Sequence, residues 1–193
     1  MKFDDYAKYK WFFTSNGKLV VGGKSAEQND ELLARVKKSG EDFIVMHTSE
    51  PGSPFSVIIE EPKKVGKEDM KEAAIFTGCF SRAWRAGKRK AIVDIFKASQ
   101  VYKMKGMKTG TWGVRGNIEH KDVELKLVLT KQKKVLRAVP EESVKKKDIL
   151  LRVCPGKIDK SQMLPKFVLE LKDNITSGEL LAALPAGGVS IIK

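Results

Sequence analysis

The segment Gly17-Lys-Leu-Val-Val-Gly-Gly-Lys-Ser25 contains residue types that cradle nucleotide phosphates in P-loops. A P-loop requires a glycine, four further residues and then Gly-Lys-Ser or Gly-Lys-Thr. Counting back from Gly23 places Lys18 where the first glycine belongs. The residues between should also form a loop with exposed backbone N–H groups, whereas Leu19-Val-Val21 is typical of a strand. The spacing therefore disfavours an ATP- or GTP-binding loop.

A different kind of anion site is compatible with the same residues. Ser25 followed three residues later by Gln28 is a capping-box pattern, which predicts the start of a helix. Lys24 would then lie beside the free backbone N–H groups of a helix N-terminus, which can hold an anion. A tight turn followed by a helix cap, with no ligand, is the alternative interpretation.

Catalytic and metal-binding residues are sparse. His47 ends an apolar stretch and could act as a general base, but no serine or cysteine lies in a nucleophile-elbow motif. Cys79 lies among apolar residues at helical spacing, where packing is expected. The other histidine and cysteine, His120 and Cys154, lie far from His47 and Cys79 in the sequence, so the four residues have no metal-ligand spacing and form no CxxC pair. We therefore predict no enzymatic activity, no metal and no cofactor, with a structural or RNA-contacting role for His47 and a catalytic role as the alternative.

The positive charge is concentrated in one third of the chain. Residues 81–147 contain 19 of the 37 Lys and Arg residues but only 6 of the 24 Asp and Glu residues, and the remainder is balanced. Such an excess predicts a polyanionic partner, and nucleic acid is favoured over an anionic membrane surface. The alternative is a highly charged protein surface that binds no polyanion. No apolar run has the length of a membrane span, and the first residues lack a signal-peptide pattern. The sequence thus predicts a cytoplasmic protein without a membrane partner.

Two basic clusters also contain aromatic residues, which stack on bases while Lys and Arg neutralise phosphates. The glycines of the second cluster allow close backbone approach and favour bent or single-stranded RNA over the major groove of DNA. Trp84 and Trp112 could instead be core residues. The predicted RNA contacts of the first cluster are Arg82, Arg85, Lys88, Arg89 and Lys90, and those of the second are Lys103, Lys105, Lys108, Trp112 and Arg115, with Tyr102 as a second candidate for stacking.

Mixed helix and strand patterns position these clusters. Asn16-Gly17 predicts a two-residue type I′ hairpin loop that places Phe13 opposite Val20. The order of elements favours an α+β fold: a mixed, mainly antiparallel sheet with an N-terminal hairpin and packed helices, in a domain of residues 1–139, and a small α/β C-terminal extension of residues 140–193 packed on it. We expect helices at 26–39, 67–85, 141–147, 160–171 and 177–184, and strands at 43–47, 55–59, 90–97, 111–114, 122–129, 134–139, 149–154 and 189–192.

Several motifs, in order and at fitting distances, give the chain a specific resemblance to a known family. They are Trp11-Phe-Phe-Thr-Ser-Asn-Gly17, Leu19-Val-Val-Gly-Gly-Lys24 with Gln28-Asn29, His47 with Pro51-Gly-Ser53, Ser81-Arg-Ala-Trp84 and Gly110-Thr-Trp-Gly-Val-Arg-Gly116. The chain resembles the NFACT-R domain, the RNA-binding module of the NFACT ribosome-associated quality-control factors. Ser143-Val-Lys145, Cys154-Pro-Gly156 and Leu184-Pro-Ala-Gly-Gly188 are similar to the C-terminal part of archaeal members, so the resemblance covers nearly the whole chain.

The resemblance implies a free-standing RNA-binding module for tRNA or ribosomal RNA, with the ribosome or another NFACT-family protein as further partners. It also brings Lys24, Asn29, His47 and Ser53 into the same module as a secondary contact surface. Pro54 stands where many bacterial members have histidine, so a hydrogen-bonding role is not carried over to that position. The alternatives are an RNA-modification enzyme or its RNA-binding accessory subunit, and a ribosome-associated protein-bridging factor.

Overall fold

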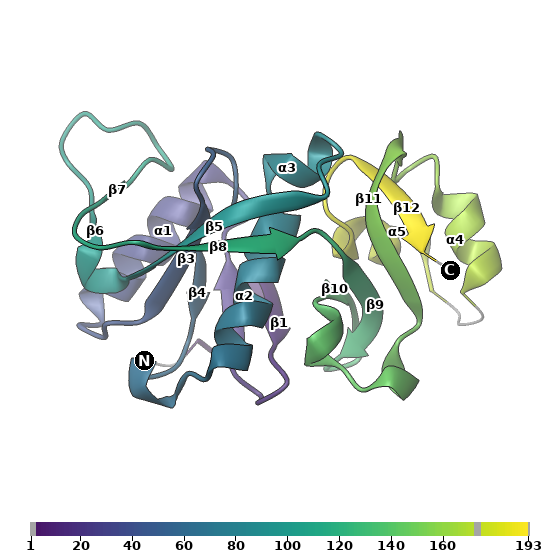
Figure 1. Ribbon diagram of the computed structural model, residues 1–193, viewed down its shortest axis with the longest axis horizontal. Coiled ribbons are helices and arrows are strands. Elements are labelled where there is room, and N and C mark those ends of the chain that lie inside the picture. The colour runs from purple at the N-terminus through teal and green to yellow at the C-terminus, as the bar shows by residue number, and fades with distance from the viewer. Residues whose placement is uncertain (1–2, 172–174, 193) are drawn as a thin grey trace.

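The computed structural model describes residues 3–171 and 175–192 as two main antiparallel sheets with helices packed on them (Figure 1). The larger sheet has the strand order β1-β2-β4-β3-β5-β8 and the smaller one the order β10-β9-β11-β12. This arrangement confirms the expected α+β class. The strands are β1 Lys10–Phe13, β2 Leu19–Gly22, β3 Ile44–Thr48, β4 Ser56–Ile58, β5 Lys90–Lys97, β6 Val101–Tyr102, β7 Gly113–Val114, β8 Glu119–Glu124, β9 Leu127–Gln132, β10 Val135–Val139, β11 Leu151–Asp159 and β12 Gly188–Ile192.

The α-helices cover both faces of the larger sheet. Alternate side chains along each strand point to opposite faces of the sheet. Those on one face, such as Trp11 and Val21, pack with α1, and those on the other face, such as Phe12 and Val20, pack with α2. The core on the α2 side continues into the smaller sheet, so one hydrophobic cluster joins the two sheets. The helices are α1 Ala26–Lys38, α2 Lys67–Cys79, α3 Arg82–Arg85, α4 Leu164–Glu170 and α5 Ser177–Ala183. No helix in the described part of the chain is long and apolar enough to cross a bilayer.

The edge of the larger sheet is closed by side chains of the smaller one. β1 is an end strand, whose outer backbone groups would otherwise lack partners. Gln132 donates to the Phe13 carbonyl (2.9 Å) and accepts from the Phe13 amide (2.8 Å), and Arg137 Nε donates to the Trp11 carbonyl (3.1 Å). β9 and β10 precede Pro140 but share a sheet with β11 and β12, so the smaller sheet draws on both sides of the expected division at 139/140, which remains a prediction.

The register predicted for the first hairpin is wrong by one residue. Phe12 pairs with Val20 and Phe13 with Leu19. Thr14 closes the loop by donating to the Lys18 carbonyl (2.9 Å), and Gly17 has φ +75° while Asn16 does not have a positive φ. A type I′ turn needs two positive φ angles, so the chain adopts a three-residue loop that uses glycine alone.

The two-residue turn with two positive φ angles occurs instead at Lys133 (φ 50°) and Lys134 (φ 65°), between β9 and β10. A left-handed conformation is unfavourable for a residue with a Cβ atom, by about 1–2 kcal/mol. Substituting Lys134→Gly is therefore expected to raise the free energy of unfolding by about 1 kcal/mol, measured by urea denaturation. Lys147→Gly, at an exposed site without this strain, is the control; a Lys134→Gly variant that is less stable than the natural chain would contradict the expectation.

Four other expected elements differ from the structure. The helix predicted at 67–85 is two helices, because the Ser81 hydroxyl accepts from the Ala83 amide and begins α3. The strand predicted at 122–129 is divided between β8 and β9, which belong to different sheets. The helix predicted at 141–147 is a pair of short 3₁₀ turns. The helix predicted at 160–171 begins at Leu164, with Pro165 in its first turn, where no amide donor is needed.

Candidate nucleic-acid interface

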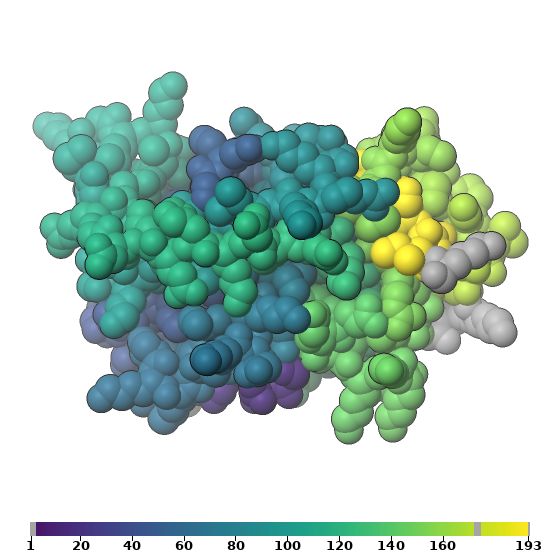
Figure 2. Space-filling model, in the orientation of Figure 1, coloured from purple at the N-terminus to yellow at the C-terminus, as the bar shows by residue number. Residues whose placement is uncertain are grey.

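A cleft of about 650 Å³ lies where four segments that are distant in the sequence meet. They are the junction before α1, the β3–β4 loop, α3, and the segment of residues 103–112 that links β6 to β7 (called the 103–112 segment). In Figures 1 and 2 this segment, in teal, projects at the end of the molecule opposite the C-terminal residues. The cleft contains seven of the predicted contact residues: Lys24, Asn29, His47, Ser53, Arg82, Arg85 and Trp112. The cleft therefore brings the four residues predicted as a secondary contact surface together with three of the ten predicted RNA contacts.

The cleft is lined by four basic side chains and one acidic one. Lys10, Lys24, Arg82 and Arg85 form no ion pair within the described part of the chain. Asp94, the single acidic residue of the lining, contacts Ser49 and His120 instead. The surface of the cleft is thus strongly positive.

Arg82 and Arg85 each pack closely against a glycine. The Gly52 carbonyl accepts from the Arg82 amide (2.9 Å), and a Cβ atom on Gly52 would lie 2.5 Å from the Arg82 side chain. A Cβ atom on Gly187 would lie 2.9 Å from Arg85. Both glycines have positive φ angles, +109° and +103°, so glycine is favoured at each position by conformation and by space.

Trp84 fixes the helix that carries these arginines. Its side chain is fully buried, which confirms the interpretation as a core residue, and Nε1 donates to the Gly188 carbonyl at 3.0 Å. This hydrogen bond links α3 to the start of β12. Arg82 and Arg85 on the same short helix remain exposed.

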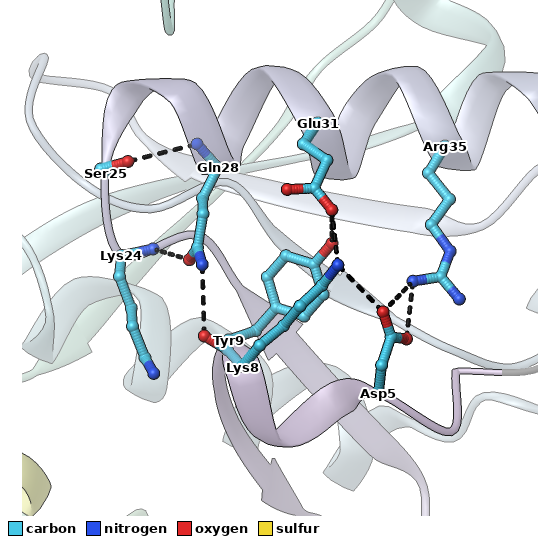
Figure 3. A network of polar contacts seen from close by, with 8 residues as sticks. All are labelled: Asp5, Lys8, Tyr9, Lys24, Ser25, Gln28, Glu31 and Arg35. Carbon is cyan, nitrogen blue, oxygen red and sulfur yellow. Dashed lines mark hydrogen bonds and ion pairs between the residues drawn. The ribbon is translucent and has the colours of Figure 1, made fainter.

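The junction before α1 has the predicted cap. Ser25 Oγ accepts from the Gln28 amide (3.2 Å), and Gln28 Oε1 accepts from the Lys24 amide (2.9 Å), as Figure 3 shows. The same figure shows the Lys24 side chain directed away from Glu31, which binds Lys8 and Tyr9. The Lys24 ammonium group therefore stays available to the cleft.

Asn29, Ser53 and His47 order the walls of the cleft. Asn29 Oδ1 accepts from the Phe55 amide (3.1 Å), and Ser53 Oγ accepts from the Thr48 amide (2.9 Å). His47 Nδ1 lies 2.7 Å from the Thr48 carbonyl, which can only accept, so this nitrogen carries hydrogen. Burial lowers the pKa of His47 in spite of that carbonyl and of Asp94, and the imidazole is uncharged at neutral pH.

Asp30 ties the 103–112 segment to α1. Its Oδ1 atom accepts from Lys103 Nζ (2.7 Å), Trp112 Nε1 (2.7 Å) and the Gly110 amide (3.1 Å). Partial burial would raise the pKa of Asp30, but the hydrogen bonds from these donors hold it below its usual range. Lys103 is therefore engaged within the protein, whereas Lys105, Lys108 and Arg115 are exposed.

The remaining predicted contacts lie beside the cleft. Lys88 pairs with Glu50 (2.8 Å), and Arg89 Nη1 lies 2.8 Å from Cys154 Sγ. Lys88 and Lys90 line a separate cavity of about 160 Å³. Tyr102, the second stacking candidate, has its ring against Gly113, where a Cβ atom would lie 2.2 Å away.

Lys10 is the functional candidate that sequence reasoning missed. It is partly buried in the cleft, and its Nζ lies 5.1 Å from the centre of the Phe80 ring. Burial, together with the positive charges of Lys24, Lys160 and Arg137, lowers the pKa of Lys10 to about 8. A single lysine at the start of a strand carries no sequence signal, and its position in the cleft follows only from the packing of the two sheets.

Two side chains that can take part in catalysis share one acceptor. The Ser49 hydroxyl and His120 Nδ1 both contact Asp94 Oδ1, and no hydrogen bond joins this serine to this histidine. Burial raises the pKa of Cys79 well above its usual value. Within residues 3–171 and 175–192, no group of three or more His, Cys, Asp or Glu residues could hold a metal ion.

Comparison with known families shows that the region forming most of this cleft matches a family model. A family model described as the NFACT protein RNA binding domain matches residues 8–116. The chain belongs to the NFACT RNA-binding family. The NFACT match confirms the resemblance read from the motifs, and it includes Lys10, Lys24, Arg82 and Arg85.

Two curated relatives extend the comparison. The archaeal Rqc2 homolog aRqcH of Methanocaldococcus jannaschii is 30% identical over 201 aligned positions, covering 97% of this NFACT chain and 29% of the relative. The ribosome quality control complex subunit NEMF of Mus musculus is 29% identical over 83 positions, covering 42% of this chain and 8% of the relative. The chain thus spans less than a third of the length of these relatives.

A solved structure supports the fold. The C-terminal part of the fibronectin/fibrinogen-binding protein from Streptococcus suis aligns with a TM-score of 0.51 and 24% identity, over 61% of this NFACT chain and 44% of that chain. At this level of identity the likeness shows a shared fold and nothing further.

Proposed function

We propose that this NFACT protein is a non-catalytic RNA-binding module that acts in ribosome-associated quality control in the cytoplasm. The observation that carries the proposal is the cleft itself. The region matched by the RNA-binding family supplies it with four basic side chains that form no ion pair with the described residues. The names of the relatives, an archaeal Rqc2 homolog and a ribosome quality control complex subunit, support a role at the ribosome. The ligand in this proposal is tRNA or ribosomal RNA.

In this proposal RNA phosphates bind Lys24, Arg82 and Arg85 in the cleft and Lys105, Lys108 and Arg115 outside it. Exposed Lys and Arg side chains release counterions when they bind phosphate, so affinity depends on salt. Trp112 is half-buried, and the hydrogen bond from its Nε1 atom to Asp30 fixes the ring at the cleft, where it stacks on a base in this proposal. Lys88, Arg89 and Lys90, which lie between the end of α3 and the start of β5, extend the contact.

The test is the salt dependence of RNA binding by Arg82→Ala/Arg85→Ala. We expect the double variant to bind tRNA or a ribosomal RNA fragment about 10- to 100-fold more weakly than the natural chain. The slope of log K against log[salt] should become shallower by about 1.4 for single-stranded RNA, because two phosphate contacts are lost. Fluorescence anisotropy between low and moderate salt measures both quantities.

Lys145→Ala/Lys147→Ala is the matched control, since it removes two exposed charges that lie outside the cleft. It should leave affinity nearly unchanged. An equal loss in both double variants would mean that only net charge matters and would reject the cleft as the interface. Mass spectrometry of the recovered RNA is expected to find it unmodified; turnover would reject the non-catalytic part of the proposal.

A further inference from the structure

We propose that the inner end of the cleft is a phosphate pocket for one unpaired nucleotide of an RNA chain, with the Lys10 ammonium group as its central ligand. This inference rests on the RNA-binding function proposed above. It adds the kind of RNA that the site selects, namely a strand with a bulged or terminal nucleotide, over continuous duplex.

The first step is that the Lys10 ammonium group has no partner for its charge among the described residues. Lys10 begins β1 opposite Gly22 and lines the cleft, and its side chain forms no hydrogen bond or ion pair with the residues that the structure describes. Its Nζ lies over the Phe80 ring, 5.1 Å from the ring centre. Partly buried charges are normally paired, because removing them from water costs free energy.

The second step is that two of the neighbouring cations, Lys160 and Arg137, are already bound to groups of the protein. Lys160 Nζ donates to the carbonyls of Leu181 (2.6 Å) and Leu184 (3.0 Å), at the end of α5. Arg137 donates to the Trp11 carbonyl and lies over the Trp11 ring, 4.6 Å from its centre. These groups raise the local potential at Lys10 without neutralising it, so an anion bound there would be attracted by all of them.

The third step is that phosphate fits the surroundings of Lys10. Lys24, which forms no ion pair with any residue that the structure describes, precedes the N-terminus of the 13-residue helix α1, whose dipole favours a negative charge. Lys10 and Lys24 repel one another in the free protein, and burial together with the charge of Arg137 lowers the pKa of Lys24. A phosphate group between the two lysines would replace this repulsion with attraction.

The fourth step is the shape of the site. A volume of about 650 Å³ lies in the range of cavities that hold ligands the size of a nucleotide. His47 is half-buried, lines the cleft and packs on Phe55 with ring centres 4.4 Å apart; in this proposal the base stacks on the imidazole. A continuous duplex keeps its bases stacked inside and cannot insert a nucleotide, whereas unpaired RNA can splay one out.

The experiment compares Lys10→Met with the natural chain on two RNAs. The probes are a fluorescent single-stranded octanucleotide and a blunt-ended duplex of the same strand, read by anisotropy at one salt concentration. We expect the natural chain to bind the single strand at least tenfold more tightly than the duplex. Lys10→Met should lose about tenfold on the single strand and little on the duplex. Methionine keeps the apolar stem over Phe80 and removes only the charge.

Lys63→Met is the control, because Lys63 is exposed, unpaired among the described residues, and outside the cleft. Lys10→Gln repeats the test if the methionine variant does not fold. Equal binding of single strand and duplex, or unchanged single-strand binding by Lys10→Met, would overturn the inference while the loss in Arg82→Ala/Arg85→Ala kept the proposed function intact. If the natural chain bound neither probe but still bound tRNA or the ribosomal RNA fragment, only the inference would fail; if it bound none of these RNAs, both would fail. Displacement of the octanucleotide by micromolar AMP would instead indicate a free-nucleotide site and also overturn the inference.

Discussion

Replacing Trp84 with alanine is expected to lower the free energy of unfolding by about 3–5 kcal/mol, measured by urea denaturation. The indole is 0% exposed in the hydrophobic cluster that includes both sheets, so alanine would leave a large cavity at their joint. The substitution would also leave the Gly188 carbonyl without the hydrogen bond that it receives from Nε1. An unsatisfied buried acceptor adds to the loss.

Trp84→Phe separates these two effects. Phenylalanine fills much of the cavity but cannot donate to Gly188, and we expect it to lose about 1–2 kcal/mol. Because α3 carries Arg82 and Arg85, Trp84→Ala should also weaken RNA binding at temperatures where the variant is still folded. Trp112→Phe is a matched control at a half-buried tryptophan, with a smaller expected loss. A loss below 1 kcal/mol in Trp84→Ala would show that this side chain does not hold α3 in place.

Local patterns predicted the elements well where neighbouring residues decide the structure. The strand expected at residues 90–97 is β5, and Ser25 caps α1 as the capping-box pattern indicated. The break between α2 and α3 was missed because Ser81 lies in a continuous apolar pattern, and only its hydroxyl geometry separates the helices. The first hairpin was shifted because Asn16-Gly17 is compatible with more than one loop length.

The candidate site was predicted in its residue types but not in its assembly. Lys24, His47 and Arg82 were singled out from separate motifs, and no pattern along the chain could place them around one cleft. Ion pairing over long sequence separations is equally hidden: Lys103 resembles a free phosphate ligand until Asp30, which is 73 positions away, is seen to bind it. Lys10 gained its role only because the second sheet brings Arg137 and Lys160 beside it.

Substituting Lys10 with methionine is expected to raise the free energy of unfolding by about 2–3 kcal/mol at pH 7, although it should weaken RNA binding. Burial and the charges of Lys24, Lys160 and Arg137 lower the pKa of Lys10 from 10.5 to about 8, so the folded state holds this proton less tightly than the unfolded chain does. Each pKa unit corresponds to about 1.36 kcal/mol, and the remaining exposure of the side chain reduces the full effect. Improved stability with impaired binding is characteristic of residues positioned for a ligand instead of for folding.

The pH dependence of this gain in stability tests whether the charge of Lys10 is its cause. Between pH 8 and 10.5 the unfolded chain binds a proton at this lysine that the folded chain does not, so the natural protein gains stability from this group as pH rises through that window. Below pH 8 both states are protonated and the full penalty applies. The stability difference between Lys10→Met and the natural chain should therefore be largest below pH 8 and shrink towards pH 10.5, in urea titrations at several pH values. Lys63→Met should show no such difference, because its side chain is exposed. A constant difference across this range would mean that methionine stabilises by packing on Phe80, and that the ammonium group is not held against an unfavourable potential.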